Sequence, residues 1–290
     1  MKTESSDTSL VKIQFVANDL LNEPTRFAFY SAIFIKEGKG VYHADFGKFV
    51  FEGPVILFST PLQTIFIESE EVIPLTLLQF HGDFYCIEYH HTEVACNGLL
   101  FNNVYVEPAI KLSTEQAEMF DALLNEIKGE LQHSGNNGVV LKTYLQLFLA
   151  KSSSIKLAAI ANDTDRPFKD ELMEKFRELL NQNYLTLRRP SDYAKLLMLS
   201  TNNLHKRARK YFNKSPSELI HERIILEAKK QLHLTRASIK EIAYLLNFND
   251  EFYFSRFFKK YAKISPAGFR EKTGISFVAD LTKSVDNNYR

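Results

Sequence analysis

The sequence predicts an α+β protein of two domains, an N-terminal antiparallel β-barrel with appended helices and a C-terminal all-helical domain. Three observations support this prediction. The chain has 290 residues, more than a single hydrophobic core usually serves. Apolar residues recur at the two-residue period of strands in the first part and at the helical period in the last part. The charged residues are also divided unequally between the two parts.

The β domain is predicted over residues 10–108. Runs rich in β-branched and aromatic residues, such as FAFYSAIFI and KFVFEGPVILFS, are separated by EGKG and EGP. This alternation, interrupted by Gly and Pro at short intervals, is typical of antiparallel strands in a sandwich or a barrel. Aromatic residues such as Phe29, Tyr30 and Phe34 are expected in its core, and the sequence identifies no ligand-binding residue.

Two helices are predicted after the strands, within residues 112–150, and they complete an N-terminal domain of residues 1–150. Apolar residues recur at three- and four-residue steps from Met119 to Ile127, and VVLKTYLQLFLA is typical of a second helix. The pair either supplies a subunit interface or covers one face of the sheet, and the sequence favours neither. Residues 151–167 have the composition of a linker, residues 168–274 are predicted to be all-helical, and residues 275–290 form a C-terminal tail.

The net charge of +1 conceals an asymmetry between the two parts of the chain. Residues 166–274 contain 23 Lys and Arg against 12 Asp and Glu, a net +11, and the remaining residues contain 13 against 23, a net −10. A basic domain of this kind is expected of a nucleic-acid binder. The alternative is a solvated basic face without a partner.

The compartment predicted from the sequence is the cytoplasm. Cys86 and Cys96 are the only cysteines, which are too few for a disulfide framework and lack a zinc-type spacing. The polar N-terminus MKTESSDTSL has no apolar segment of a signal peptide. No apolar run approaches the ~20 residues of a spanning helix, so we expect no membrane association.

An internal repeat defines the helical part. Asp192 to Pro216 aligns with Glu241 to Pro266, and the Ser-Pro pairs near the end of each copy are 50 residues apart. In each copy a short helix with a small Ala is followed by a turn and a basic helix, with Ser200 or Asn249 as the expected N-cap. This is the layout of a helix-turn-helix, whose second helix enters the DNA major groove. Residues 217–233 have a helical apolar pattern and are predicted to be a rigid spacer. Two reading helices on one face of DNA need a separation of about 34 Å, which such a spacer can hold.

Each second helix is predicted to have a buried side and a DNA-facing side. In the first copy Leu204 and Ala208 take the inner side, and in the second copy the buried stripe is Phe254, Phe257, Phe258 and Tyr261. Asn suits adenine edges and Lys or Arg suits guanine edges, although phosphate contact is commoner for a single basic side chain. The predicted DNA-contacting residues are Asn202, Asn203, His205, Lys206 and Arg209 in the first copy, and Glu251, Phe252, Ser255, Arg256, Lys259 and Lys260 in the second.

Three segments of the helical part, ERIILEAKKQL, SIKEIAYLLNFNDEFYFSRFFKKY and SPAGFR, closely resemble the signature of the AraC/XylS family of bacterial transcription regulators. The resemblance implies seven helices, two of which read a duplex operator that is often bent. The base-facing positions that the resemblance implies are Asn202, His205, Lys206, Glu251, Phe252, Ser255 and Arg256.

The sequence departs from the family pattern at several positions. Asn213, Asn247 and Lys263 stand where the family usually has glycine. Asn tolerates the left-handed backbone conformation, whereas Lys has no such explanation. Ala208 replaces a large apolar residue and Phe252 replaces a small polar one, so the DNA specificity need not follow that of relatives.

The segment FIKEGKGVYHADFGKFVFEGPVILFSTPLQTIFI resembles the paired strands of the cupin-type barrel that many family members use for sensing. In enzymes such a barrel binds a metal through two closely spaced histidines, a glutamate and a later histidine. Here His43 is followed by Asp45, and Gln63 and Thr64 offer no imidazole, so we predict no metal and no cofactor. The other histidines considered, to which no role is assigned, are His81, His90 and His91.

The predicted function is a sequence-specific DNA-binding transcription regulator whose cupin-like N-terminal domain senses a small molecule. The expected partners are double-stranded DNA, RNA polymerase, a small-molecule effector and a second copy of the chain. The sequence leaves open whether the protein is an activator or a repressor. The alternative function is a cupin-type metal-dependent enzyme fused to a helical accessory domain, which requires metal ligands that the sequence does not show.

Overall fold

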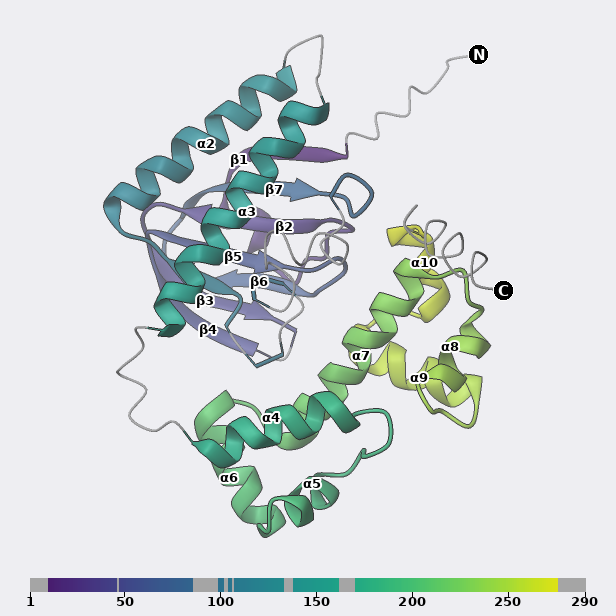
Figure 1. Ribbon diagram of the computed structural model, residues 1–290. Coiled ribbons are helices and arrows are strands. Elements are labelled where there is room, and N and C mark those ends of the chain that lie inside the picture. The colour runs from purple at the N-terminus through teal and green to yellow at the C-terminus, as the bar shows by residue number, and fades with distance from the viewer. Residues whose placement is uncertain are drawn as a thin grey trace, which may run out of the picture. The chain divides into compact units, whose positions relative to one another are not determined.

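The computed structural model divides the chain into two compact units (Figure 1). The first unit comprises Met1–His43, Phe49–Phe101 and Pro108–Lys156, and the second comprises Ala44–Lys48, Asn102–Glu107 and Leu157–Arg290. The residues that the structure describes are 10–45, 47–85, 99–101, 104–105, 107–132, 138–161 and 170–275. Cys86, His90, His91, Cys96 and nearly all of the predicted C-terminal tail lie outside these residues.

The strands form two sheets. A five-stranded antiparallel sheet has the order β1-β7-β2-β5-β8, and a three-stranded sheet has the order β4-β3-β6. A short 3-10 helix, η1 (Asn18–Leu21), follows the first strand. The strands are β1 (Val11–Ala17), β2 (Tyr30–Ile35), β3 (Lys39–Ala44), β4 (Gly47–Glu52), β5 (Val55–Ser59), β6 (Ile65–Glu68), β7 (Pro74–Phe80) and β8 (Ala109–Lys111).

The prediction of an α+β chain with a β-rich N-terminal part and a helical C-terminal part is confirmed, and the described strands form two sheets rather than a closed barrel. In the described part of the chain, β1 and β8 remain the outer strands of the larger sheet. Strand β8 pairs with β5 only from Val55 to Leu57. The chain then enters a helix at Thr114, so a helix rather than a further strand follows the edge of the sheet. The alternation of apolar residues fits a sandwich as well as a barrel, which is why the sequence did not separate the two.

Strand β2 lies at the centre of the larger sheet and is buried on both faces. Its neighbours are in register with Ala32 opposite Leu78 of β7 and Phe58 of β5. Alternate residues of a strand point to opposite faces, so Tyr30, Ala32 and Phe34 share one face and belong to one core cluster. Buried strands of this kind have near-continuous apolar sequences, as YSAIFI does.

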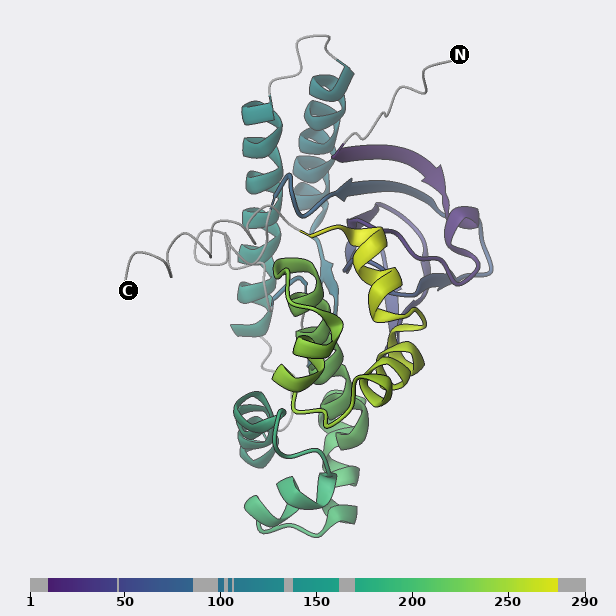
Figure 2. The ribbon, with the colours of Figure 1, turned by 90° about the vertical axis from the view of Figure 1, so that its right-hand side faces the viewer.

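Helices α2 (Thr114–Gln132) and α3 (Gly138–Ala161) cover that face of the sheet, running side by side in both views (Figures 1 and 2). Phe120 and Phe148 meet edge to face between them, with ring centroids 5.1 Å apart. Both rings are fully buried in the same core cluster as the strand residues. The sequence left open whether these two helices cover the sheet or form a subunit interface, and the structure shows that their inner sides cover the sheet.

Helix α3 continues to Ala161, so residues 151–161 are helical and do not form the predicted linker. The serines of this segment suggested a linker, but a serine hydroxyl can donate to a carbonyl of its own helix. The Ser152 hydroxyl donates to the carbonyl of Phe148 at 2.8 Å within the helix. Lys156 is also buried and donates to the carbonyl of Ala109 at 2.6 Å. The remaining residues of the predicted linker lie outside the described part of the chain.

Residues 170–275 contain seven helices and no strand, as the family resemblance implied. The predicted spacer is α7, whose Ser215 N-cap and Glu218 form a reciprocal capping box. Within the described residues no helix is long and apolar enough to cross a membrane. The helices are α4 (Glu171–Asn183), α5 (Pro190–Leu196), α6 (Thr201–Phe212), α7 (Pro216–Leu234), α8 (Ile239–Leu245), α9 (Glu251–Ala262) and α10 (Pro266–Thr273).

Candidate nucleic-acid interface

The first helix-turn-helix consists of α5 and α6. Helix α5 ends in a left-handed residue, Met198 (φ 55), and two backbone hydrogen bonds close the turn. The Leu199 N–H donates to the carbonyl of Ala194 at 2.8 Å, and the Met198 N–H donates to that of Lys195 at 3.1 Å, which is the Schellman pattern. Ser200 then caps α6 by accepting the Asn203 N–H at 3.2 Å, as predicted.

The second helix-turn-helix, α8 and α9, repeats this geometry. The left-handed residue is Asn247 (φ 58), and the Phe248 N–H donates to the carbonyl of Ala243 at 2.9 Å. The N-cap of α9 is Asp250, which accepts the Tyr253 N–H at 2.7 Å, so the prediction of Asn249 is wrong by one residue. Both side chains can cap a helix, and a carboxylate is additionally favoured by the positive end of the helix dipole.

The two reading helices are in register at an offset of 50 residues. Both begin after their caps at Thr201 and Glu251, and both end in a left-handed residue, Asn213 (φ 55) and Lys263 (φ 58). The three positions where the family usually has glycine therefore all need the left-handed conformation, which includes the unexplained Lys263.

The buried sides of the reading helices follow the prediction in part. Leu204 and Ala208 are fully buried in α6, and Phe254 and Phe258 are fully buried in α9. Phe257 and Tyr261 are only half-buried. Their rings lie against His221 of α7, with centroids 5.6 and 4.6 Å away. The predicted stripe of α9 thus consists of two core rings and two half-buried rings that contact the spacer helix.

None of the eleven predicted DNA-contacting residues is buried. On α6, Lys206 lies one turn after Asn202, and on α9, Arg256 lies one turn after Phe252. Among the described residues no ion pair involves Lys206 or Arg256, which leaves both charges to solvent. The exposed members are Asn202, Asn203, His205, Lys206, Arg209, Phe252, Arg256, Lys259 and Lys260, and the half-buried members are Glu251 and Ser255.

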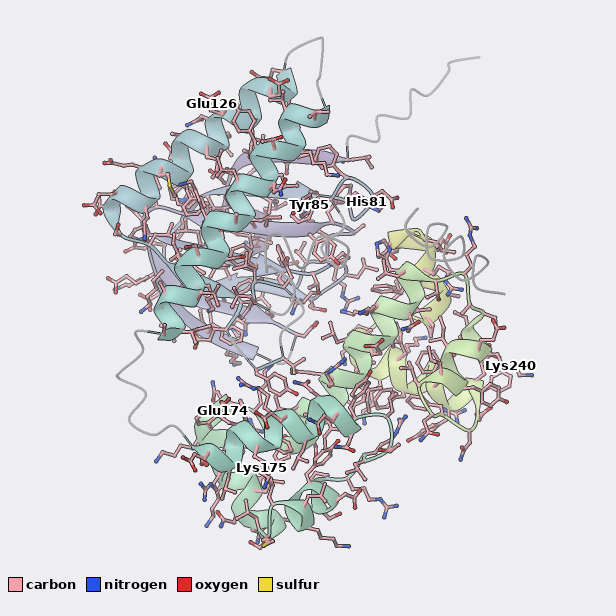
Figure 3. The ribbon with its side chains drawn as sticks, in the orientation of Figure 1. His81, Tyr85, Glu126, Glu174, Lys175 and Lys240 are labelled. Atoms are coloured by element: carbon pink, nitrogen blue, oxygen red, sulfur yellow. The ribbon has the colours of Figure 1, made fainter. Side chains whose placement is uncertain are left out.

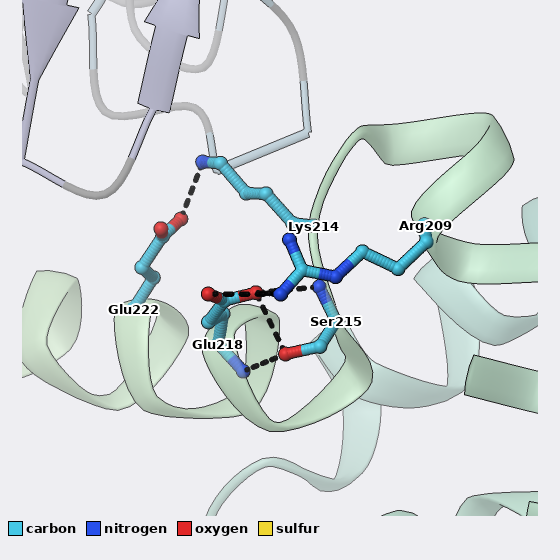
Figure 4. Close-up of polar contacts among 5 residues, drawn as sticks. All are labelled: Arg209, Lys214, Ser215, Glu218 and Glu222. Atoms are coloured by element: carbon cyan, nitrogen blue, oxygen red, sulfur yellow. Dashed lines mark hydrogen bonds and ion pairs between the residues drawn. The ribbon is translucent and has the colours of Figure 1, made fainter. Parts of the chain in front are cut away.

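Arg209 differs from the other predicted contacts because a carboxylate already holds it. Its Nη2 lies 3.2 Å from Oε2 of Glu218, which also receives the backbone N–H of Ser215 at 2.6 Å (Figure 4). These contacts, together with the hydrogen bond from the Ser215 hydroxyl, lower the pKa of Glu218 despite its partial burial. Arg209 therefore braces the start of α7 as well as facing solvent.

A second ion pair lies beside this one and is more deeply buried. Lys214 Nζ is 2.7 Å from Oε2 of Glu222 (Figure 4). Burial outweighs the attraction of Lys214 and raises the pKa of Glu222 to about 7. This pair was not predicted, because in the sequence Lys214 and Glu222 resemble ordinary surface charges near a helix end.

Arg188 joins the two motifs directly and was not predicted. Its Nη2 donates to the carbonyls of Leu246 and Asn247, the latter at 3.3 Å, and its guanidinium lies 4.2 Å from the ring centroid of Phe248. In return the Asn247 side chain donates to the carbonyl of Leu185 at 3.0 Å. The segment before the first motif is therefore tied to the turn of the second, in addition to the connection through α7.

The first motif is also anchored to α4 by an ion pair. Arg207 donates to both carboxylate oxygens of Asp170, at 2.8 and 2.5 Å. Asp170 at the same time caps α4 by accepting the N–H groups of Leu172 and Met173. The paired guanidinium lowers the pKa of Asp170. Elsewhere on the domain basic side chains extend into solvent, as Lys240 does from α8 (Figure 3).

The N-terminal residues considered as metal ligands have other roles. His43 Nε2 lies 3.0 Å from Oε2 of Glu68, and its ring stacks on Phe66. Gln63 accepts the Thr60 N–H at 3.1 Å, which closes a turn. His81, near the end of β7 (Figure 3), accepts the Asp83 N–H at 3.2 Å. Within the described ranges, no three His, Cys, Asp or Glu side chains are grouped so that they could hold a metal ion.

Comparison with known proteins supports the reading of the helical part. Residues 193–272 match the family model described as a helix-turn-helix domain. The raffinose operon transcriptional regulatory protein RafR of Pediococcus pentosaceus is 32% identical over 96 residues, which is 33% of this chain and 35% of RafR. The Msm operon regulatory protein of Streptococcus mutans is 32% identical over 100 residues, 34% of this chain and 36% of that protein. The matched region thus spans about a third of the length of these relatives.

A solved structure of ToxT from Vibrio cholerae aligns with most of the chain. It is 16% identical, the alignment covers 92% of this chain and 99% of ToxT, and the TM-score is 0.40. A TM-score this low supports no conclusion about function.

Proposed function

We propose that this chain, which carries an AraC-type helix-turn-helix domain at residues 193–272, is a sequence-specific DNA-binding transcription regulator. One observation carries the proposal: the domain holds two helix-turn-helix motifs in the same register, each with exposed polar and basic side chains on its second helix. The net charge of +11 over residues 166–274 supports binding to a polyanion.

In this proposal α6 and α9 enter successive major grooves on one side of the duplex. Helix α7 has 19 residues, which corresponds to about 28 Å, and it contacts both reading helices. A spacer of this length suits a separation near one turn of DNA, about 34 Å.

Binding should depend steeply on salt. The logarithm of the affinity should fall linearly with the logarithm of the salt concentration, because cations are released from the phosphates that the protein contacts. Gel-shift titrations of the full chain at several salt concentrations measure the slope. If no duplex from a random pool is bound at low salt, the proposal is wrong.

Arg256 separates base reading from phosphate contact. Arg256→Ala should cost about 1 to 3 kcal/mol of binding to the selected site if the guanidinium reads a base. Binding to an unrelated duplex should then fall much less. Equal losses on both duplexes would make Arg256 a phosphate contact, and the two titrations decide between these roles.

The N-terminal domain is proposed to sense a small molecule. The support is the cupin-like strand pattern and the buried two-sheet architecture, together with a relative named as the regulator of a raffinose operon. Selection of bound sequences from a random duplex pool, with and without a metabolite extract, tests this. A sequence preference or affinity that is identical in both conditions would contradict sensing.

The remaining partners are also proposals. RNA polymerase is expected because the predicted role is transcription regulation, and the cytoplasm is the expected compartment. A second copy is expected to bind through α3, where Leu147, Leu157 and Ile160 are exposed. Light scattering of the full chain tests the last point, and a monomer at all concentrations would contradict it.

A further inference from the structure

Phe252 is a large apolar side chain that the fold leaves in water. It is the second residue of α9 and is 72% exposed, whereas Phe254 and Phe258 of the same helix are fully buried. Within the described residues Phe252 makes no aromatic ring contact and no cation–π contact, although most of the neighbouring aromatic residues make ring contacts. The packing of the domain therefore gives no reason for a phenylalanine at this position.

The position of Phe252 is on the side of α9 that carries the predicted DNA contacts. Phe252, Arg256 and Lys259 stand at the i, i+4 and i+7 spacing, so they lie on one side of the helix. The N-terminal turn of the second helix is the part that meets base edges in this type of motif. In the register of the two motifs, the residue of α6 that corresponds to Phe252 is Asn202.

The chemistry of the side chain limits what it can read. A phenyl ring neither donates nor accepts a conventional hydrogen bond, so it cannot read the donor and acceptor groups that distinguish most base edges. The apolar group that the four bases present in the major groove is the C5 methyl of thymine. The exposed ring of Phe252 thus suits a thymine, and the neighbouring Arg256 suits an adjacent base that presents hydrogen-bond acceptors, such as guanine.

We infer that Phe252 contacts the C5 methyl of a thymine in the half-site of the second motif. This inference rests on the proposed DNA-binding function and adds the identity of one base to it. The first motif, with Asn202 at the same position, reads by hydrogen bonding instead. The two half-sites of the operator are therefore different in sequence at this position, and the site is not a simple repeat.

The test replaces thymine by deoxyuridine, which lacks only the methyl group. The full chain is first used to select a duplex, and each thymine of the bound site is then replaced singly. For the wild-type chain, one replacement in the half-site of the second motif should weaken binding about fourfold, the factor that corresponds to burial of one such group (~0.8 kcal/mol). Phe252→Ala should bind the thymine and deoxyuridine duplexes equally.

A matched control is Tyr244→Ala, which removes another exposed aromatic side chain but from α8. This variant should keep the full thymine preference. Circular dichroism verifies that both variants remain folded, as expected for exposed positions.

The outcomes separate the inference from the function on which it rests. If the wild-type chain selects a sequence but shows no thymine preference, or if Phe252→Ala keeps that preference, the inference is wrong and the DNA-binding function stands. If Tyr244→Ala loses the preference as Phe252→Ala does, the inference is also wrong. If the chain selects no sequence at all, the proposed function itself is wrong.

Discussion

The two helix-turn-helix motifs have the same backbone frame but are held in place by different interactions. Around α6 the supports include three ion pairs: Arg207 with Asp170, Lys214 with Glu222, and Arg209 with Glu218. At the positions 50 residues later, the chain has Ile264, Gly268 and Lys272 in place of Lys214, Glu218 and Glu222. The ion pairs after α6 therefore have no counterpart after α9.

Around α9 the supports are aromatic. The rings of Phe248, Phe254, Phe258 and Phe269 follow one another at centroid distances of 5.2, 6.0 and 5.8 Å. The large residue is also placed differently, because α6 has Ala208 and Phe212 where α9 has Phe258 and Ala262. The same backbone geometry is thus stabilised by two kinds of interaction. The stability contributed by the ion pairs should depend on pH, whereas that contributed by the aromatic contacts should not.

Truncation in the aromatic support should cost most. Phe258→Ala removes a fully buried ring between α9 and α10 and should lower the free energy of unfolding by about 3 to 5 kcal/mol. Urea denaturation of the full chain measures the loss. Truncation of the exposed Phe252 is the control and should cost less than about 0.5 kcal/mol. A loss below 1 kcal/mol for Phe258→Ala would show that the ring cluster does not hold α9.

The ionic support should titrate near neutral pH through Glu222. Its pKa in the folded protein is about 7, above the ordinary 4.5, so the folded state binds more protons than the unfolded state between these values. The stabilising contribution of protonated Glu222 should fall as pH rises from about 4.5 to about 7, by about 3 kcal/mol in all. Glu222→Gln removes this change, so the difference in unfolding free energy between wild type and variant should vary with pH by that amount.

The variant isolates Glu222 from a neighbour with the opposite effect. Burial lowers the pKa of His221, so its contribution to stability grows as pH rises through its ordinary 6.5. Both the wild-type chain and Glu222→Gln contain this histidine, and it cancels in the difference. Glu241→Gln is the control, because the pKa of Glu241 is lowered by its hydrogen bonds to Ser238, and its difference from wild type should be constant above pH 5. A constant difference for Glu222→Gln as well would contradict the prediction.

The tie between the motifs should have an intermediate effect. Arg188→Met removes the donors to the carbonyls of Leu246 and Asn247 and should lower the unfolding free energy by about 2 kcal/mol. It should also weaken binding to a site that needs both motifs more than binding to a single half-site. Arg189→Met changes the exposed neighbouring arginine and should alter stability by less than about 0.5 kcal/mol. Equal effects of the two variants on stability and binding would rule out the tie.

The smallest change is expected at the left-handed residue of the first turn. Met198 has φ 55 and its side chain is 95% exposed, so Met198→Gly should relieve backbone strain at little cost in packing. The expected gain is about 1 kcal/mol in unfolding free energy. Lys206→Gly, in the interior of α6, should instead lose about 1 kcal/mol. A loss at both positions would mean that the φ of Met198 carries no strain.

The sequence predicted the helical domain better than the β domain, for physical reasons. The repeat sets the caps, the left-handed ends and the buried stripes, all of which are local and depend on spacing. Asp250 replaced Asn249 as the cap because adjacent side chains of similar capping strength differ only by the length of the turn. The sequence did not decide between a sandwich and a barrel, because alternation shows which face of the sheet a residue takes and not which strand lies beside it.

The contacts between distant residues left no trace in the sequence. Arg188 lies 58 residues from Leu246, and its neighbour Arg189 is equally basic but exposed. No periodic pattern in the sequence shows which of these two arginines makes the contact with the second motif. Lys214 and Glu222 likewise are eight residues apart, and only the packing around them makes the pair buried. The role of each predicted DNA contact stays a prediction for the same reason.

The link through Arg188 and Asn247 also bears on the DNA that both motifs are proposed to bind together. Inserting one base pair between the half-sites would rotate one of them by about 34° around the duplex axis, since a turn contains about 10.5 base pairs. If the motifs were connected only through α7, they could reorient to follow that rotation. Here the motifs are connected both through α7 and through the contacts of Arg188 and Asn247, so their relative orientation is fixed. The number of base pairs between the two half-sites should therefore not vary.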